Sequence, residues 1–567
     1  MTQQSSDIRA DQTAATLSPD AVLRIQDLHI DYAARGQVFP AIRGVSFDVA
    51  PGEVVALVGE SGSGKSTLAL SALGMLPDTA RISRGSITLA GHALAGHGSK
   101  GLDERAANGI RGRDAGWIPQ DPMTALNPLH RIGRQVAEPL VIHRLLDRGE
   151  IDDKVVALLA RVHIPDPAVR ARQFPHELSG GMRQRVLIAA AIGPGPKLIV
   201  ADEPTTALDV TVQKAILDDI DALVADTGMA MLLITHDLGV AADRADRIIV
   251  LKEGKIVEQG GALQIMTRPR HDYTRQLLAN APGLSARRRP APQPAQQAPA
   301  PAGAPLLALR GVSHAFVSDR GARGEHRVQA VDDVSLDVPQ GKTLAVVGES
   351  GSGKSTSARI ALGLTAPDSG SVWFEGVDIR RLDRAGIRRM RRLVQPIYQN
   401  PVASFDPRFT VADLIGEPLI GFGLGDKTRR RRRIRELMEQ VGLPQPLLGR
   451  YPAELSGGQL QRVAIARALA PEPALLICDE PVSALDVSIQ AQILDLLASL
   501  QASHGLSYLF ITHDLAVVRQ MADRVVVMKA GRIVESGPVD DIFTHPRHEY
   551  TRLLLASIPG RAARTPL

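Results

Sequence analysis

The sequence predicts an α/β protein made of two homologous modules in tandem, because three segments occur twice. The first recurs letter for letter after 289 residues, and the other two recur after 277 residues. Between these segments short apolar runs alternate with stretches of helical pattern, which is typical of a mostly parallel sheet covered by helices on both faces. The repeated pairs are Val58–Thr67 with Val347–Thr356, Leu178–Gly181 with Leu455–Gly458, and Ile234–Asp237 with Ile511–Asp514.

In the first module the expected elements follow the apolar pattern in chain order. Alternating residues predict an antiparallel section, and uninterrupted apolar runs predict buried strands. The antiparallel strands are expected at 22–32, 45–49 and 86–89, and the buried strands at 54–58, 198–201 and 231–234. Helices are expected from the glycine-rich loop to about Leu76, within 131–172, from Ser179 and from about Val210. Near the end of each module, 252–255 and 529–532 predict a hairpin.

Length and composition fit this plan. At 567 residues the chain is too long for one compact core. Its single cysteine, Cys478, excludes a disulfide framework, a cysteine-rich zinc module and a cysteine-ligated iron–sulfur cluster, and is expected to be a small buried core residue. The net charge of +5 permits anionic partners but selects none. No apolar stretch is long enough to span a membrane and the first 22 residues carry no apolar export signal, so a cytoplasmic location is expected.

Composition also divides the chain into five expected segments. A stretch rich in proline, alanine and glutamine has no apolar period and cannot build a core, so it predicts a linker. The expected organisation is a disordered leader at 1–21, a first domain at 22–281, the linker at 282–305, a second domain at 306–560 and a tail at 561–567.

A glycine-rich loop after the first buried strand of each module fits the pattern G-x-x-x-x-G-K-[ST]. Its glycines let backbone N–H groups wrap a phosphate at a helix N-terminus, where the helix dipole favours negative charge. The lysine reaches the β- and γ-phosphates, and the hydroxyl that follows it suits Mg²⁺. The candidate nucleotide-binding residues are Gly59, Glu60, Ser61, Gly62, Ser63, Gly64, Lys65, Ser66 and Thr67, and Gly348, Glu349, Ser350, Gly351, Ser352, Gly353, Lys354, Ser355 and Thr356; Ser66 and Ser355 are also candidate metal ligands.

A pair of carboxylates ends a later buried strand in each module. The first acid, Asp202 or Asp479, can hold Mg²⁺. The second, Glu203 or Glu480, can orient and deprotonate an attacking water. Such a pair alone is weak evidence, but its place after the glycine-rich loop, repeated in both modules, predicts nucleotide hydrolysis.

These residues and four further motifs resemble the ATP-binding cassette (ABC) family over nearly the whole chain. The resemblance implies two tandem ABC-type P-loop NTPase domains, each with a mostly parallel RecA-like sheet, an antiparallel β subdomain and a helical subdomain. The further motifs are the signature motif at Leu178–Gly181 and Leu455–Gly458, the glutamine loop at Gln120 and Gln399, the loop through which the two sites touch at Ala207–Asp209 and Ala484–Asp486, and the switch histidine at His236 and His513.

The resemblance also implies a role for each motif. In the family the switch histidine contacts the γ-phosphate, and the glutamine loop links Mg²⁺ and the water to the transmembrane partner. The signature helix serves the nucleotide of the opposite module, so an intramolecular pseudo-dimer closing on two ATP molecules is expected, with both sites hydrolysing. The residues implied are Glu203, His236, Glu480 and His513 for catalysis, Ser179, Gly180, Gly181, Ser456, Gly457 and Gly458 for nucleotide contact, and Gln120 and Gln399 for nucleotide and metal.

Two details accompany this assignment. Met182 stands where the signature motif usually has glutamine, and little effect of this difference on the function of the motif is expected. Tyr32 and Phe316, 27 and 32 residues before the glycine-rich loops, are the candidate adenine-stacking aromatics, with packing in the strand core as the alternative for either residue.

Within the family, the chain resembles bacterial importers of oligopeptides, dipeptides and nickel. Matching segments include Gln120–Pro128 and Gln399–Pro407, and both halves end in a similar extension at Arg268–Thr274 and His545–Thr551. The resemblance implies two fused ATPase subunits that use ATP and Mg²⁺, attached peripherally to the cytoplasmic side of the inner membrane. The implied partners are two transmembrane permease subunits and an extracytoplasmic substrate-binding protein; the cargo, whether peptide, nickel, glutathione or opine, stays open.

Two other classes of function are alternatives to the importer. A soluble tandem ABC ATPase acting on ribosomes or nucleic acid would also fuse two cassettes, but such proteins usually join them by a long charged helix. A drug or macrolide exporter fits the C-terminal extension poorly. The run Arg429–Arg433 has no interleaved aromatic residues, so it indicates the solvated start of an amphipathic helix, and no nucleic-acid partner is expected.

Overall fold

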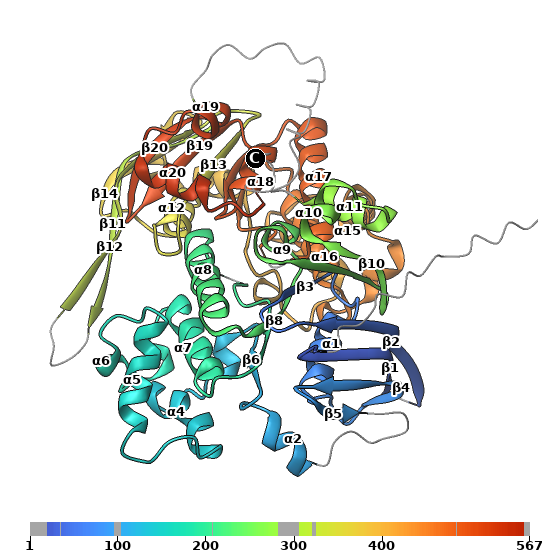
Figure 1. The fold of residues 1–567 in the computed structure, drawn as a ribbon. Helices are drawn as coiled ribbons and strands as arrows, with labels where there is room; N and C mark the ends of the chain where they lie inside the picture. The colour runs from blue at the N-terminus through green and yellow to red at the C-terminus, as the bar shows by residue number, and fades with distance from the viewer. Residues whose placement is uncertain are drawn as a thin grey trace, which may run out of the picture. The chain divides into compact units, whose positions relative to one another are not determined.

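A computed structural model describes residues 20–34, 36–95, 104–206, 208–281, 305–319, 325–483 and 485–560. The residues divide into two compact units, one drawn from within 1–274 and the other mainly from 275–567. Each of the two halves, 20–281 and 305–560, contains a four-stranded and a six-stranded sheet, which confirms the predicted α/β class and the duplication (Figure 1). The predicted leader, linker and tail lie almost wholly outside the described residues.

In the first half the four-stranded antiparallel sheet has the order β2-β1-β4-β5, and the six-stranded sheet has the order β10-β9-β3-β8-β7-β6. The strands from β9 to β6 run parallel, and β10 pairs antiparallel with β9 in the predicted hairpin. The strands are β1 (Leu23–Ala34), β2 (Gln37–Val49), β3 (Val54–Val58), β4 (Ala80–Leu89), β5 (His92–Ala95), β6 (Ala115–Ile118), β7 (Leu198–Asp202), β8 (Ala230–Thr235), β9 (Arg247–Lys252) and β10 (Lys255–Gly261).

The helices of the first half follow the expected order with two differences. The helix after the glycine-rich loop ends at Ala72, four residues before the predicted end, because Gly74 takes a left-handed conformation with φ of 62° and closes a Schellman turn. The stretch 131–172 forms three helices rather than one segment. The helices are α1 (Lys65–Ala72), α2 (Glu104–Ile110), α3 (Pro122–Ala125), α4 (Ile132–Ile142), α5 (Ile151–Arg161), α6 (Pro167–Arg170), α7 (Gly180–Ile192), α8 (Val210–Thr227), α9 (Leu238–Arg244), α10 (Ala262–Thr267) and α11 (Asp272–Asn280).

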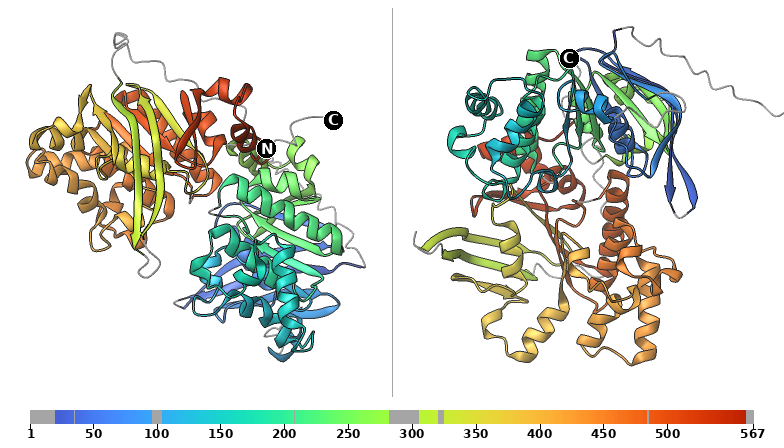
Figure 2. Two further views of the ribbon diagram at one scale, coloured as in Figure 1. Left: turned by 90° about the vertical axis from the view of Figure 1, so that its left-hand side faces the viewer. Right: turned by 90° about the horizontal axis from the view of Figure 1, so that it is seen from below.

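The second half repeats both sheets, with the orders β12-β11-β14-β15 and β16-β17-β18-β13-β19-β20. Its long antiparallel pair, β11 and β12, is drawn in yellow-green in Figure 2. The strands are β11 (Leu307–Asp319), β12 (Glu325–Val338), β13 (Thr343–Val347), β14 (Ser369–Phe374), β15 (Val377–Asp378), β16 (Val394–Ile397), β17 (Leu475–Asp479), β18 (Ser507–Ile511), β19 (Arg524–Lys529) and β20 (Arg532–Pro538).

The helices of the second half confirm the expected helix at the arginine run. Arg429–Arg433 lie in α15, whose N-terminus is capped by Asp426 and whose inner face buries Leu437 and Met438. Cys478 is fully buried in the apolar core of β17 and the surrounding helices, as predicted. The helices are α12 (Lys354–Ala361), α13 (Arg384–Leu393), α14 (Val411–Gly421), α15 (Lys427–Gln440), α16 (Gly457–Leu469), α17 (Val487–His504), α18 (Leu515–Met521), α19 (Val539–Thr544) and α20 (Glu549–Ala556).

No helix in the described part of the chain is long and apolar enough to cross a membrane.

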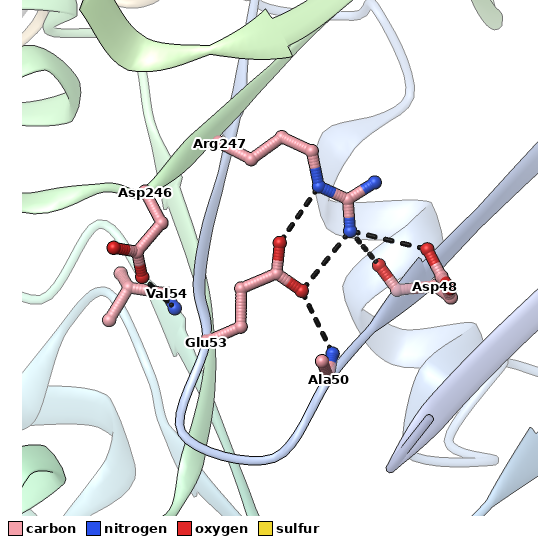
Figure 3. A network of polar contacts seen from close by, with 6 residues as sticks. All are labelled: Asp48, Ala50, Glu53, Val54, Asp246 and Arg247. Atoms are coloured by element: carbon pink, nitrogen blue, oxygen red, sulfur yellow. Dashed lines mark hydrogen bonds and ion pairs between the residues drawn. The ribbon is translucent and has the colours of Figure 1, made fainter. Parts of the chain in front are cut away.

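A polar network joins the two sheets of the first half (Figure 3). Arg247, at the start of β9, donates from Nε to Glu53 at 2.8 Å and from Nη2 to the carboxylate and the backbone carbonyl of Asp48 at the end of β2. Asp246 accepts the backbone N–H of Val54 at 2.9 Å. The network therefore fixes the start of the central strand β3 against β9 and against the antiparallel sheet.

A second anchor fixes the C-terminal extension of each half to the last strand of the large sheet. Glu258 in β10 accepts the backbone N–H groups of Arg270 at 2.7 Å and His271 at 3.0 Å. Glu535 in β20 accepts those of Arg547 at 2.8 Å and His548 at 3.1 Å. The turn that precedes α11 or α20 is thus held by one carboxylate.

We predict that Glu258→Gln destabilises the protein in a pH-dependent way. Burial alone would raise the pKa of Glu258, but the Thr274 hydroxyl beside it and the N–H groups of Arg270 and His271 hold this pKa below its ordinary value. A lowered pKa means that the carboxylate stabilises the fold above its ordinary pKa, and that this contribution is lost as the pH falls through the folded-state pKa. Replacing this charged acceptor is expected to cost about 1.5–3 kcal/mol at neutral pH.

The measurement is the free energy of unfolding of the wild type and the variant by denaturant titration, from neutral pH down to about pH 3, so that the range extends below the ordinary pKa of glutamate. Glu253→Gln, on the exposed turn of the same hairpin, controls for the loss of one negative charge. A difference between Glu258→Gln and the wild type that does not shrink on acidification would contradict the assigned role of the carboxylate.

Candidate nucleotide-binding and hydrolysis sites

The glycine-rich loop of the first half leaves the end of β3 and enters α1. Lys65 at the start of the helix turns back and donates from Nζ to the carbonyls of Gly59 at 2.7 Å and Glu60 at 2.9 Å. Gly59 has φ of 157°, and a Cβ there would overlap the carbonyl oxygen of Leu251 at the end of β9. Only glycine permits this close approach of loop and strand.

The second half repeats this loop between β13 and α12. Lys354 Nζ donates to the carbonyls of Gly348 at 2.7 Å and Glu349 at 2.8 Å. Gly348 has φ of 155°, and a Cβ there would overlap the carbonyl oxygen of Met528. The predicted residues, from Gly59 to Thr67 and from Gly348 to Thr356, therefore form two equivalent loops whose last three residues belong to the first turn of α1 or α12.

Both loops fit a phosphate group. The hydroxyl oxygens of Ser63 and Ser352 are buried and have no hydrogen-bond partner in the part of the chain that the structure describes. Lys65 and Lys354 are buried cations, and burial lowers the pKa of Lys354. An anion placed at the helix N-terminus would satisfy the hydroxyl, the ammonium group and the first backbone N–H groups of the helix together.

The paired strands bring the predicted metal ligands to the same edge of the sheet. β7 pairs in parallel with β8, and β8 with β3, so Asp202 reaches the loop that follows β3. Asp479 accepts a hydrogen bond from the Ser355 hydroxyl at 3.2 Å. Burial, with the neighbouring glutamate, raises the pKa of both aspartates. A serine hydroxyl and a carboxylate are oxygen ligands that suit Mg²⁺ when it also binds phosphate and water.

Glu203 is the centre of a hydrogen-bond network that joins three of the predicted residues. Gln120 Nε2 donates to its Oε2 at 2.7 Å, and His236 Nδ1 lies 2.8 Å from its Oε1. Thr206 also donates to Oε2, at 3.0 Å. Burial alone would raise the pKa of Glu203, but the hydrogen bond and charge of His236 hold this pKa below its ordinary value.

Glu480 makes the same contacts in the second half, with Gln399 Nε2 at 2.8 Å and His513 Nδ1 at 3.1 Å. Burial alone would lower the pKa of His513, but Glu480 outweighs burial and raises it. Both Glu203 and Glu480 have left-handed backbones, with φ of 46° and 47°. This uncommon conformation, repeated in both halves, is characteristic of functional positions.

Tyr32 and Phe316 occupy equivalent register positions in the two antiparallel sheets. Tyr32 pairs with Phe39 and Phe316 with Val328, and each partner lies 26 residues before its loop lysine. The Tyr32 hydroxyl lies 3.4 Å from the Thr67 hydroxyl. Phe316 is 49% exposed, so the core-packing alternative is wrong for this residue. Adenine stacking stays a prediction for both.

The signature residues cap a helix in each half and do not join the network of Glu203 or Glu480. Ser179 accepts the backbone N–H of Met182, and Ser456 that of Gln459, both at 3.4 Å. Gln459 Oε1 also accepts the N–H of Ser456 at 3.0 Å and completes a capping box, which a methionine cannot do. The two signature helices thus differ at this cap. Ala207 and Ala484, in the loops through which the sites are predicted to touch, lie outside the described residues.

One pair of residues that contacts the glycine-rich loops is not among the site residues predicted from the sequence. Tyr273 and Tyr550, from the C-terminal extensions, accept the backbone N–H groups of Glu60 and Glu349. In the sequence, both tyrosines lie in the segments that recur in the two extensions, Arg268–Thr274 and His545–Thr551.

Comparison with known proteins agrees with this geometry. The family model described as "ABC transporter" matches residues 42–206 and 331–483. The model described as "Oligopeptide/dipeptide transporter, C-terminal region" matches residues 257–306 and 534–566. The chain therefore belongs to the ABC transporter family, which confirms the predicted resemblance, and it is an ABC-type ATPase with two ATPase domains.

Two curated relatives are similar over nearly all of the chain. The chain is 43% identical over 609 residues to the oligopeptide transport ATP-binding protein OppD of Mycobacterium bovis, covering 95% of this chain and 98% of that protein. It is 43% identical over 562 residues to the glutathione import ATP-binding protein GsiA of Escherichia coli strain K12, covering 95% of this chain and 89% of that protein. Among solved structures, a dimeric ATP-binding cassette with bound ADP and phosphate is 30% identical, covering 41% of this chain and 98% of that one, with a TM-score of 0.38.

We predict that Gly59→Ala and Gly348→Ala each weaken ATP binding at their own loop at least about tenfold, because the new methyl group displaces the loop from the neighbouring strand. The matched controls are Gly91→Ala and Gly376→Ala, which lie in turns of the antiparallel sheets, outside the glycine-rich loops. These glycines have φ of 86° and 78°, but a Cβ at either position meets open space.

Equilibrium binding of ATP to the four variants tests this prediction. The controls carry the cost of a left-handed backbone, about 1–2 kcal/mol, without the overlap. Equal affinities for a variant and its control would show that the close approach to the strand does not shape the loop.

Proposed function

We propose that this chain is the ATP-hydrolysing subunit of a bacterial importer of peptides or related small solutes. The observation that carries the proposal is that each half joins a complete Glu–His–Gln network to an extension of the oligopeptide/dipeptide transporter type. The names of the two relatives, an oligopeptide and a glutathione import protein, support peptides as the cargo.

The proposed roles follow the geometry of each half. Lys65 and Lys354 bind the β- and γ-phosphates at the helix N-terminus. Glu203 and Glu480, with lowered pKa values, are ionised at neutral pH and so accept a proton from the attacking water. His236 and His513 hold these carboxylates from one side, and Gln120 and Gln399 hold them from the other.

Mg²⁺ would be held by Ser66 and Asp202 in one half and by Ser355 and Asp479 in the other, with Gln120 and Gln399 as further candidates. When bound, it supplies positive charge that offsets the developing charge on the phosphate oxygens. The raised pKa of each aspartate supports this role, since a cation would stabilise its ionised form.

The proposed partners are two permease subunits, which would carry the cargo across the membrane, and an extracytoplasmic substrate-binding protein. The chain would attach to the cytoplasmic face of the permease subunits as a peripheral component. The signature residues of one half are proposed, from the family resemblance, to serve the nucleotide of the other half.

We predict that the double variant Glu203→Gln/Glu480→Gln hydrolyses ATP at least about 100-fold more slowly than the wild type, because it lacks both proton acceptors. Each single variant is expected to hydrolyse ATP at a rate between those of the wild type and the double variant. Both glutamines retain the size and hydrogen bonding of the carboxylate, so ATP binding should persist. Phosphate release and equilibrium ATP binding are the two measurements; a double variant that keeps more than half of the wild-type rate would overturn the assignment.

We predict that a peptide-loaded binding protein stimulates ATP hydrolysis several-fold when the chain is reconstituted with its permease subunits in nanodiscs. Stimulation arises because the loaded partner stabilises the conformation that hydrolyses ATP. The unloaded binding protein and the Glu203→Gln/Glu480→Gln chain are the controls. Stimulation by ribosomes or RNA in place of the binding protein would favour the alternative class of tandem ABC ATPase.

A further inference from the structure

In each half the C-terminal extension reaches the first peptide of the glycine-rich loop. The Tyr273 hydroxyl accepts the backbone N–H of Glu60 at 3.1 Å, across 213 residues of sequence. The Tyr550 hydroxyl accepts that of Glu349 at 3.0 Å, across 201 residues. Both tyrosines are almost fully buried, with 4% and 3% of their surface exposed.

The loop residue that makes this contact has both of its backbone polar groups hydrogen-bonded. The carbonyl of Glu60 accepts Lys65 Nζ at 2.9 Å and the N–H of Ser63 at 3.1 Å. The tyrosine hydroxyl accepts the N–H group of the same residue. An unpaired N–H group here would cost free energy and leave the loop free to turn, so the tyrosine completes the hydrogen bonding of the loop entrance.

The tyrosine is itself fixed in three ways. Its ring lies under a lysine ammonium group, Lys252 at 4.7 Å in the first half and Lys529 at 4.8 Å in the second. Its backbone N–H donates to the Nδ1 atom of the histidine two residues earlier, at 3.1 Å in both halves. The turn before it is held by Glu258 or Glu535.

The hydroxyl is held in one protonation state. Burial raises the pKa of Tyr550 to about 12, so this hydroxyl is neutral near pH 7. It therefore retains a proton of its own while its oxygen accepts the N–H group of the loop.

We propose that Tyr273 and Tyr550 are positioning residues of the two nucleotide sites, through which docking of the C-terminal extension and binding of phosphate in the loop strengthen each other. The inference rests on the proposed assignment of the nucleotide phosphates to the two loops. Because coupling between two binding events is reciprocal, ATP must stabilise the docked extension by the same factor by which the docked extension tightens ATP binding.

The test is the full-length double variant Tyr273→Phe/Tyr550→Phe, which keeps both rings and both lysine contacts and removes only the hydroxyls. ATP binding is expected to weaken about three- to tenfold, the factor that one hydrogen bond supplies. The rate at saturating ATP is expected to stay within about twofold of the wild type, so that KM changes and kcat does not. ATP should also slow hydrogen exchange in α11 and α20 of the wild type but not of the variant.

Tyr508→Phe is the matched control. This tyrosine is equally buried, and its hydroxyl donates to the carbonyl of Leu497 at 2.7 Å within the core, away from the loops. A purely structural effect of a lost hydroxyl would appear in this variant too. Equal ATP affinity and equal exchange protection in the wild type and the double tyrosine variant, or the same change in Tyr508→Phe, would overturn the proposal.

A second variant separates this outcome from failure of the proposed function. Lys65→Ala/Lys354→Ala removes the phosphate-binding ammonium groups and should abolish ATP binding. If that variant still binds ATP like the wild type, the loops are not the phosphate sites and the proposed function fails. If the lysine variant no longer binds ATP while the tyrosine variant binds ATP like the wild type, only the coupling of the extension to the loop is refuted.

Discussion

The position of the central parallel strand determines the geometry of each half. β3 pairs with β8 on one side and β9 on the other, and β13 pairs with β18 and β19 in the same way. Because parallel strands end at one edge of a sheet, this pairing fixes the glycine-rich loop beside the residues that follow the neighbouring strands. The site residues come from distant parts of the chain, and strand pairing alone places them together.

The local part of this arrangement could be predicted from the sequence. The strand at 54–58, the start of a helix at Ser179 and the hairpin at 252–255 each depend on neighbouring residues, and the structure confirms them. The carboxylate, histidine and glutamine were predicted as separate motifs. Their convergence on Glu203 and Glu480 needed the sheet order, which no local pattern encodes.

What the sequence could not predict depends on long-range contacts or on loop length. The roles of Tyr273 and Tyr550 depend on contacts that span more than 200 residues. The equivalence of Tyr32 and Phe316 could not be recognised from their distances to the glycine-rich loops, because these distances differ by five residues. The difference arises between each residue and its partner on the next strand, Phe39 or Val328. The end of α1 at Ala72 was predicted too late, because the helical pattern of the sequence continues past residue 72. The left-handed Gly74 ends the helix earlier than this pattern indicates.

The contact between Tyr273 and the loop also sets an order of events during synthesis. Glu60 is synthesised 213 residues before its hydroxyl partner. At a translation rate of about 5–20 residues per second, the hydroxyl of Tyr273 is made about 10 to 40 s after Glu60. A ribosome that stops between residues 236 and 273 therefore leaves a first half that contains the proposed catalytic residues Glu203 and His236 but lacks the hydroxyl partner of the loop entrance. The hydrogen bond at the loop entrance can thus form only after nearly all of the first half has been synthesised.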